Sequence, residues 1–188
     1  MAYNFEKYSD NDLYNLLSNG SKESELAFLE IYRRYSGRIY AYCRRFLGNK
    51  EDAMDVFQDT FVRFYHSAKE MRQMSNLSAF LLRIAKNLCL NYLRQKKQSL
   101  EVEDYMSHID IENQNDTNEM MKLIENAINQ LPDDFREIFI LREYQGMSYN
   151  EIAQHLNISL SLVKVRLFRA KEKLREILAP IISELSKF

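Results

Sequence analysis

Apolar residues recur every three or four positions along four stretches in the first half of the chain, and this spacing predicts four helices. The first is short, can be capped by Ser9, and carries Leu13, Leu16 and Leu17. The next three are each about 20 residues long, with polar residues on the opposite side, and such helices can enclose the core of a bundle. These three helices are predicted over roughly 22–47, 50–70 and 77–97.

The second half of the chain contains the pattern of a helix-turn-helix. Leu131-Pro132 places proline at the first position of a helix that runs to about Tyr144. Ser148 and Glu151 have the spacing of a capping box and predict the start of the next helix. The tripeptide Asn-Ile-Ser at 157–159 then turns the chain, and its serine can cap a last helix. A short helix, a tight turn and a second helix with apolar anchors are typical of a DNA-binding helix-turn-helix.

The last predicted helix has one apolar side and one cationic side. From Leu160 to Arg175, six Lys or Arg residues stand against one acid, Glu172, which suits a polyanionic partner. The predicted inward positions are Leu162, Val163, Leu167, Ala170 and Leu174. The predicted outward positions are Ser161, Lys164, Val165, Phe168, Arg169 and Lys173.

Charge is strongly segregated along the chain, although the net charge is only −1. Residues 63–97 hold eight Lys or Arg and one acid, whereas residues 101–120 hold seven acids and no Lys or Arg. Two basic helical blocks on either side of an acidic spacer indicate two contact sites on a polyanion. The spacer is polar and lacks helical periodicity, so we expect a flexible linker. The predicted organisation is an N-terminal domain over 1–98, a linker over 99–117 and a C-terminal domain over 118–188.

Composition narrows the class of protein further. Glycine (4) and proline (2) are scarce, which favours an all-α fold of two small helical domains. No apolar run approaches the roughly 18–20 residues that cross a bilayer, and no signal peptide is visible, so we expect a cytoplasmic protein without membrane insertion. Cys43 and Cys89 lie in apolar patterns and are expected to be buried and reduced. We expect no enzymatic activity, cofactor or metal, because phosphate loops, nucleophile–base patterns and metal-ligand spacings are missing.

The third and fourth predicted helices have polar sides of opposite character. On the third, Asp55 and Asp59 stand one turn apart, where like charges repel, and this indicates a cationic partner surface. On the fourth, Asn87 and Asn91 recur one turn apart among Lys and Arg residues. Asparagine amides suit base edges, whereas Arg and Lys suit phosphates. The fourth helix is therefore a second candidate for contact with nucleic acid.

These stretches resemble a known family. The C-terminal DNA-binding domain of bacterial extracytoplasmic-function (ECF) sigma factors, of the sigma-70 family, is similar to residues 131–176, which read LPDDFREIFILREYQGMSYNEIAQHLNISLSLVKVRLFRAKEKLRE. The N-terminal domain of that family is similar to residues 27–65 and 80–97, which read AFLEIYRRYSGRIYAYCRRFLGNKEDAMDVFQDTFVRFY and FLLRIAKNLCLNYLRQKK. Phe80 departs from the family because tryptophan is common there, and Val165 because a small polar residue is frequent.

The resemblance implies a sigma factor that binds core RNA polymerase and directs initiation at promoters with a downstream (−10) and an upstream (−35) element. The implied partners are core polymerase, duplex and melted promoter DNA, and an anti-sigma factor. The implied polymerase contacts are Asp55, Val56, Gln58, Asp59 and Phe61. The implied contacts to the downstream element are Arg83, Lys86, Asn87, Asn91 and Arg94. The implied contacts to the upstream element are Ser161, Lys164, Val165, Arg166, Phe168, Arg169 and Lys173.

Two other classes of protein share some of these features. A helix-turn-helix transcriptional regulator with an N-terminal sensing or dimerisation domain would look similar in its C-terminal half. Such a regulator does not need an acidic docking face or a second basic helix, and it would not program core polymerase to initiate. An adaptor whose basic faces bind acidic proteins would lack salt-sensitive promoter binding.

Overall fold

The computed structural model describes residues 5–18, 22–68, 76–103 and 119–185, and every regular element in these ranges is helical. This confirms the predicted all-α fold. Contacts between Cα atoms divide the chain into two compact units, Met1–Arg44 with Asn49–Tyr92, and Arg45–Gly48 with Leu93–Phe188. No helix within the described ranges has the length and apolar character needed to cross a bilayer. The elements are η1 (Phe5–Lys7), α1 (Asp10–Ser18), α2 (Lys22–Leu47), α3 (Lys50–Ala68), α4 (Leu77–Glu103), α5 (Glu119–Asn129), α6 (Asp133–Phe139), η2 (Ile140–Tyr144), α7 (Tyr149–Leu156) and α8 (Leu160–Leu185).

Polar side chains determine where the helices of the first unit begin. At the start of α1, the Asp12 N–H donates to Ser9 Oγ at 3.2 Å, and the Ser9 N–H donates to the Asp12 carboxylate at 3.0 Å. The Asn49 side-chain oxygen accepts two backbone N–H groups of α3 at 2.7 and 3.0 Å, and that of Asn76 accepts one of α4 at 2.9 Å. These caps satisfy backbone donors that have no partner inside the helix. Gly48, at φ 75°, ends α2 in the left-handed conformation that glycine adopts without strain.

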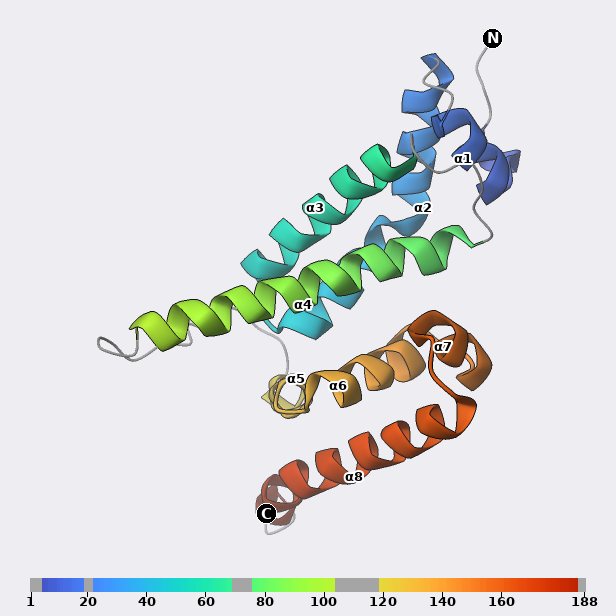
Figure 1. Cartoon of the computed structure of the whole chain (residues 1–188). Helices are drawn as coiled ribbons and strands as arrows, with labels where there is room; N and C mark the ends of the chain where they lie inside the picture. The colour runs from blue at the N-terminus through green and yellow to red at the C-terminus, as the bar shows by residue number, and fades with distance from the viewer. Residues whose placement is uncertain (1–4, 19–21, 69–75, 104–118, 186–188) are drawn as a thin grey trace. The chain divides into compact units, whose positions relative to one another are not determined.

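Aromatic side chains join α2 to α3 along a contact that runs from the buried core to the surface of the first unit. The Phe61 ring lies 4.8 Å from that of Tyr32 and 5.3 Å from that of Phe57, measured between centroids. Phe28 meets Phe61 and Tyr65 edge-on. Such pairs contribute about 0.5–1.5 kcal/mol each beyond the burial of their area. Figure 1 shows the long helices α2, α3 and α4 packed together in this unit.

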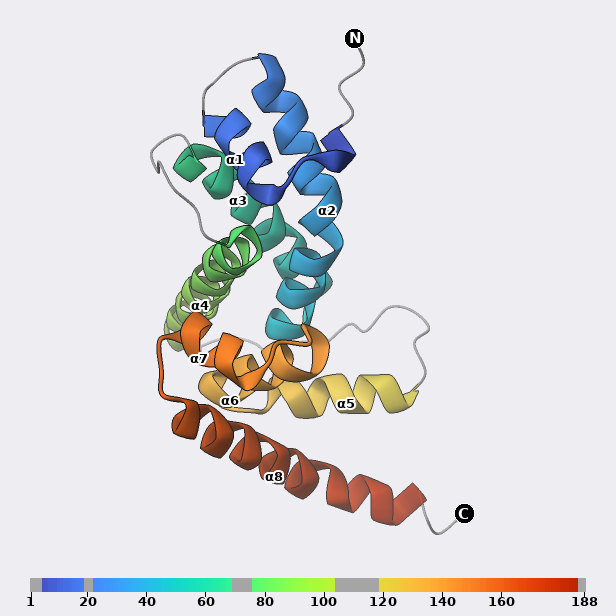
Figure 2. The ribbon, with the colours of Figure 1, turned by 90° about the vertical axis from the view of Figure 1, so that its right-hand side faces the viewer.

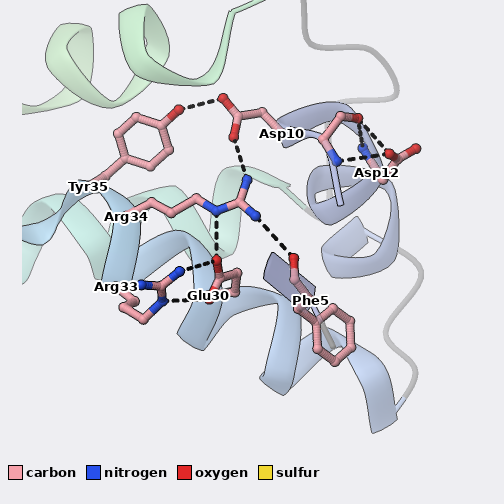
Figure 3. Close-up of polar contacts among 8 residues, drawn as sticks. Phe5, Asp10, Asp12, Glu30, Arg33, Arg34 and Tyr35 are labelled. Atoms are coloured by element: carbon pink, nitrogen blue, oxygen red, sulfur yellow. Dashed lines mark hydrogen bonds and ion pairs between the residues drawn. The ribbon is translucent and has the colours of Figure 1, made fainter. Parts of the chain in front are cut away.

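An ion-pair network joins η1 and α1 to the middle of α2 (Figure 3). Arg33 binds the Glu30 carboxylate through two bonds of 2.8 Å, and Arg34 binds it at 2.7 Å. Arg34 also donates to Asp10 at 3.2 Å and to the Phe5 carbonyl at 3.0 Å. The hydrogen bond from Arg33, followed by that from Arg34, lowers the pKa of Glu30 to about 2 against the opposing effect of its burial. The network therefore anchors the N-terminal elements on α2 through charge-assisted hydrogen bonds.

Tyr35 completes this network. Its hydroxyl donates a short hydrogen bond to the Asp10 carboxylate, and burial together with that bond raises the pKa of Tyr35. Asp10 therefore accepts bonds from two neighbouring residues of α2, Arg34 and Tyr35. This double attachment holds the first turn of α1 in one place.

In the second unit, α8 packs against α5, α6 and α7. In Figure 1 and Figure 2, α5 and α6 lie next to α8. The predicted capping box is confirmed, since the Glu151 N–H donates to Ser148 Oγ at 3.2 Å and the Ser148 N–H donates to the Glu151 carboxylate at 2.7 Å. One buried cluster joins α5 to α8 and consists of Ala127, Ile128, Leu131, Ala170 and Leu174.

Three details of this unit differ from the prediction. Helix α5 is absent from the predicted elements, although Ile124, Ala127, Ile128 and Leu131 have the spacing of an amphipathic helix. Pro132 is the N-cap of α6 rather than its first residue. The predicted continuation to Tyr144 is present, but its last five residues form the π-helical turn η2.

The end of α4 lies beyond the predicted domain boundary at residue 98, since the helix continues to Glu103. Residues 104–117 of the predicted linker lie outside the described residues, and the domain limits stay a prediction. Cys43 and Cys89 are buried and reduced, as predicted. Phe80 packs edge-on against Phe64, with ring centroids 6.2 Å apart, so it occupies a packing position.

Candidate nucleic-acid and partner interfaces

Helix α3 presents an acidic stripe that consists of Asp55, Gln58 and Asp59. All three side chains are exposed, and their i, i+3, i+4 spacing places them on one face of the helix. The structure does not bring Val56 and Phe61, which were grouped with them, to this surface. Both are buried in the bundle core, where Phe61 packs against Tyr32 and Phe57. Their burial allows them to position the stripe, and their part in polymerase contact stays a prediction.

An apolar groove continues the acidic stripe towards the end of α3. Val62 lies one turn beyond Asp59 and is 55% exposed, and Leu29 on α2 is 59% exposed. Between them lies a cavity of about 540 Å³. Its lining consists of Glu25, Phe28, Leu29, Phe61, Val62, Tyr65 and His66. Sequence reasoning missed this groove; the available signal was apolar residues on the side of α2 and α3 that faces away from the core stripe.

Helix α4 carries an amide face formed by Arg83, Asn87, Asn91 and Arg94. All four side chains are exposed, and their spacing of three or four residues places them in one row. Lys86, predicted with them, is half-buried and lies to one side of the row. The face therefore combines two amides, which offer a donor and an acceptor each, with two guanidinium groups at its ends.

A hydrogen bond fixes α4 against α3. The Tyr92 hydroxyl donates to Asp52 Oδ1 at 2.6 Å. This bond, followed by burial, raises the pKa of Tyr92 to about 12. Because Tyr92 follows Asn91 and Asp52 precedes the acidic stripe by one turn, the bond sets the rotation of the amide face relative to that stripe.

The turn between α7 and α8 has the backbone that a helix-turn-helix requires. Asn157 adopts the left-handed conformation at φ 54°, which asparagine tolerates better than most residues. The Ile158 N–H then donates to the Ala153 carbonyl at 3.0 Å and closes the end of α7. As predicted, Ser159 caps α8, since its Oγ accepts the Leu162 N–H at 3.2 Å.

The predicted outward face of α8 is exposed in the structure. Val163, Leu167, Ala170 and Leu174 are buried on the opposite side, as predicted. The inward placement of Leu162 is wrong, because this side chain is 37% exposed at the edge of the buried stripe. The members of the outward face are Ser161, Lys164, Val165, Phe168, Arg169 and Lys173.

Ion pairs divide the cations of α8 into two groups. Arg166 binds Asp134 of α6 at 2.5 Å, and Lys171 binds Glu143 of η2 at 2.8 Å. Lys164 and Arg169 form no ion pair with any residue that the structure describes. Arg166 therefore braces α8 against α6, whereas Lys164 and Arg169 remain available to a polyanion.

Comparison with known proteins gives matches over both halves of the chain. The family model for sigma-70 region 2 matches residues 31–99, and that for sigma-70 region 4 matches residues 121–174. The ECF RNA polymerase sigma-E factor of Haemophilus influenzae is 28% identical over 94% of this chain and 99% of its own length. The ECF RNA polymerase sigma factor SigW of Bacillus subtilis is 30% identical over 82% of this chain and 90% of its own length.

A solved structure has a similar fold. CnrH in complex with the cytosolic domain of CnrY gives a TM-score of 0.66 at 25% identity, over 89% of this chain and 96% of that one. The acidic stripe and the amide face lie within the residues matched by region 2, and the outward face of α8 lies within those matched by region 4.

Proposed function

The chain belongs to the ECF sigma factors of the sigma-70 family and directs promoter-specific transcription initiation, and we propose from this premise how its surfaces divide that work. It is not an enzyme; its surfaces bind a polymerase and a promoter. Three surfaces of different chemistry are available for these contacts, namely the acidic stripe, the amide face and the outward face of α8.

The acidic stripe and the apolar groove together form the docking surface for core RNA polymerase. Asp55 and Asp59 place two like charges one turn apart on an exposed face, an arrangement that a cationic partner stabilises. Val62 and Leu29 add exposed apolar area beside the carboxylates, which is the usual composition of an interface centre beside a charged rim. Steering by the carboxylates would then bring the apolar groove into contact with the polymerase.

The amide face of α4 reads and opens the downstream promoter element. Asn87 and Asn91 can form paired hydrogen bonds with base edges or with sugars, and Arg83 and Arg94 can hold phosphates on either side. Amide side chains suit strand opening because they replace hydrogen bonds that bases lose when they leave the duplex. Lys86, beside this row, is expected to contribute through its charge.

The outward face of α8 reads the upstream element in the major groove. In a helix-turn-helix, the N-terminal residues of the second helix contact base edges, and here these are Ser161, Lys164 and Val165. Lys164 and Arg169 have no competing ion pair among the described residues, so they are the strongest candidates for contact with DNA. Arg166 acts indirectly, by holding α8 in place through Asp134.

An anti-sigma factor is a further expected partner. CnrH, whose fold is similar, was solved in complex with another protein, the cytosolic domain of CnrY. Transcription initiation places the protein in the cytoplasm. The observation that supports the whole proposal best is the presence of two exposed cationic faces, one with Arg and Asn in the region 2 match and one with Lys and Arg in the region 4 match, together with an acidic face.

A run-off transcription experiment tests the proposal. Purified chain and core polymerase would be combined on a promoter selected from a random library, and on variants altered in the upstream or the downstream element alone. We expect initiation only when the chain is present. Substitutions of the amide face should change the preference at the downstream element, and those of α8 at the upstream element. If every substitution weakened all promoters equally, the division into two readers would be wrong.

A further inference from the structure

The outward face of α8 contains two apolar side chains that the fold does not use. Val165 is 45% exposed and Phe168 is 60% exposed, and both lie on the side of α8 opposite Val163 and Leu167. A β-branched residue and an aromatic residue at exposed positions of a helix reduce its intrinsic stability relative to alanine. Because neither side chain is buried, they add little to the stability of the fold, and contact with a partner explains their presence better.

The surroundings of these two residues restrict the chemistry of that partner. Lys164 precedes Val165 and Arg169 follows Phe168, and neither cation is paired with a described residue. Ser161 lies one turn before Val165 on the same face. A surface with apolar centres between free cations matches a polyanion that itself carries apolar groups.

The major groove of DNA carries one such group. Only thymine among the four bases presents a methyl group there, on C5, and it is read by apolar contact. Val165 and Phe168 have no donor or acceptor, so they cannot satisfy the polar edge of guanine, adenine or cytosine. Covering the cytosine amino group with either side chain would leave a donor without a partner, which is costly.

The position of both residues along α8 agrees with base contact. They fall within the first nine residues of a helix that begins at Leu160, and this is the end that enters the groove in a helix-turn-helix. Glu172, two turns beyond Val165 on the same side, is exposed and acidic, and its cationic neighbour Lys173 pairs with Glu176 at 3.2 Å, so this part of α8 is less suited to phosphates than the part around Lys164 and Arg169. The base-reading part of α8 therefore ends close to Arg169.

We propose that Val165 and Phe168 are specificity-determining residues that read thymine C5-methyl groups in the upstream promoter element. This inference rests on the proposed function of α8 in reading that element. Lys164 and Arg169 provide affinity through the backbone or base edges, and the two apolar residues require thymine at the positions that face them. The upstream element of this sigma factor therefore contains at least two such thymines.

The test begins with a library in which the upstream segment is randomised, from which holoenzyme containing the full chain selects its preferred duplexes. Each thymine of the selected upstream element is then replaced singly by deoxyuracil, which removes the C5-methyl and leaves the hydrogen-bonding groups unchanged. We expect two or more replacements to weaken binding about three- to fivefold each, as the loss of one buried methyl group implies. Absence of enriched thymine, or equal affinity for thymine and uracil at every position, overturns the proposal.

Variants assign each methyl to its reader. Val165→Ala should remove the thymine-over-uracil preference at one position, and Phe168→Ala at another. Lys164→Gln is the matched control, because it should weaken thymine and uracil duplexes by the same factor and preserve their ratio. Both apolar side chains are exposed, so the alanine variants should keep the thermal stability of the original chain, which circular dichroism would verify. Retention of the thymine preference in both alanine variants contradicts the proposal, and an anti-sigma or dimer contact then accounts for the two side chains.

The same experiment separates the inference from the function on which it rests. If Lys164→Gln and Arg169→Gln leave promoter affinity unchanged, α8 does not read the upstream element, and both proposals fail. If those variants weaken binding while uracil has no effect, the function of α8 stands and only the methyl reading is wrong.

Discussion

The Tyr92 hydroxyl of α4 donates a 2.6 Å hydrogen bond to the Asp52 carboxylate of α3. Tyr92 is adjacent to Asn91 in the amide face, and Asp52 lies one turn before Asp55 in the acidic stripe. One bond thus couples the orientation of the surface that we assign to DNA with that of the surface that we assign to polymerase.

Tyr92→Phe should lower the free energy of unfolding by about 1 kcal/mol, because it leaves the Asp52 acceptor without this donor. The pKa of Tyr92 is raised to about 12, so its stabilising contribution is complete below the ordinary value of 10 and is lost as the pH rises to about 12. Urea denaturation of the original chain and of Tyr92→Phe, at assay pH values from 8 to 12, would measure the difference in their free energies of unfolding. Tyr8→Phe is the control, since the Tyr8 hydroxyl bonds to none of the described residues. An equal effect of both substitutions would contradict the role of this bond.

The Glu30 network should make the stability of the chain depend on pH in the acidic range. Because the pKa of Glu30 is lowered to about 2 from the ordinary 4.5, its contribution is present above pH 4.5 and is lost as the pH falls towards 2. At pH 6 the original chain should therefore be more stable than Glu30→Gln. The difference should become smaller as the pH falls from 4.5 towards about 2. Thermal denaturation of both proteins at several pH values would measure it. A difference that is independent of pH would show that the Glu30 charge contributes nothing.

Arg166 and Arg169 should have separate effects, although both are cations of α8. Arg166→Gln removes the pair with Asp134 and should lower stability by about 0.5–1 kcal/mol, with little change in the salt dependence of DNA binding. Arg169→Gln should leave stability unchanged and reduce the slope of log affinity against log salt by about 1 if it contacts a phosphate. Denaturation and salt-titrated promoter binding, carried out on both variants, would distinguish them. If both variants changed stability and salt dependence by the same amounts, the assignment of Arg166 to helix packing and of Arg169 to DNA contact would be wrong.

Asp55→Arg and Asp59→Arg should weaken the complex with core polymerase by roughly 2 kcal/mol, or about thirtyfold in Kd, because each replaces attraction to a cationic surface with repulsion. Both side chains are exposed, so the fold should be preserved. Glu176→Arg on α8 is the matched control for the change in net charge. Fluorescence titration with core enzyme would give the three affinities, and original affinity in both α3 variants would rule out the docking role.

Gly37→Ala should stabilise the first unit. Gly37 lies in the interior of α2, it is exposed, and a Cβ atom added there meets no other atom within 4 Å. Alanine in place of glycine in an exposed helix interior contributes about 1 kcal/mol, equivalent to a rise of about 4–8 °C in Tm for a small domain. Scanning calorimetry would measure it, and an unchanged or lower Tm would show that this part of α2 needs glycine for another reason.

Helix positions could be predicted from the sequence wherever a local signal existed. Ser148 with Glu151 determined the start of α7, and Gly48 the end of α2, because caps act within a few residues. Helix α5 carries the amphipathic spacing, but it borders the acidic spacer that dominates the composition of that stretch. The π-helical turn η2 has no comparable signature.

The rotation of each helix was harder to predict than its position. Val56 and Phe61 were grouped with the acidic stripe, yet they point into the core, because the packing of α2 against α3 decides which side of α3 is buried. The sequence does not distinguish Arg166 from the neighbouring cations of α8, because its ion pair with Asp134 forms only when α6 packs against α8. The apolar groove also forms only where α2 and α3 pack side by side. Such properties arise from contacts between distant residues and have no local signal in the sequence.

The Arg34 network also has a consequence for the order of events during synthesis. Arg34 follows the Phe5 carbonyl that it binds by 29 residues, and Asp10 by 24. At about 5–20 residues per second, the ribosome adds Arg34 roughly 1.5–6 seconds after Phe5. During that interval η1 and α1 have been made but Arg34 has not, so these first elements become anchored only after the middle of α2 has been synthesised.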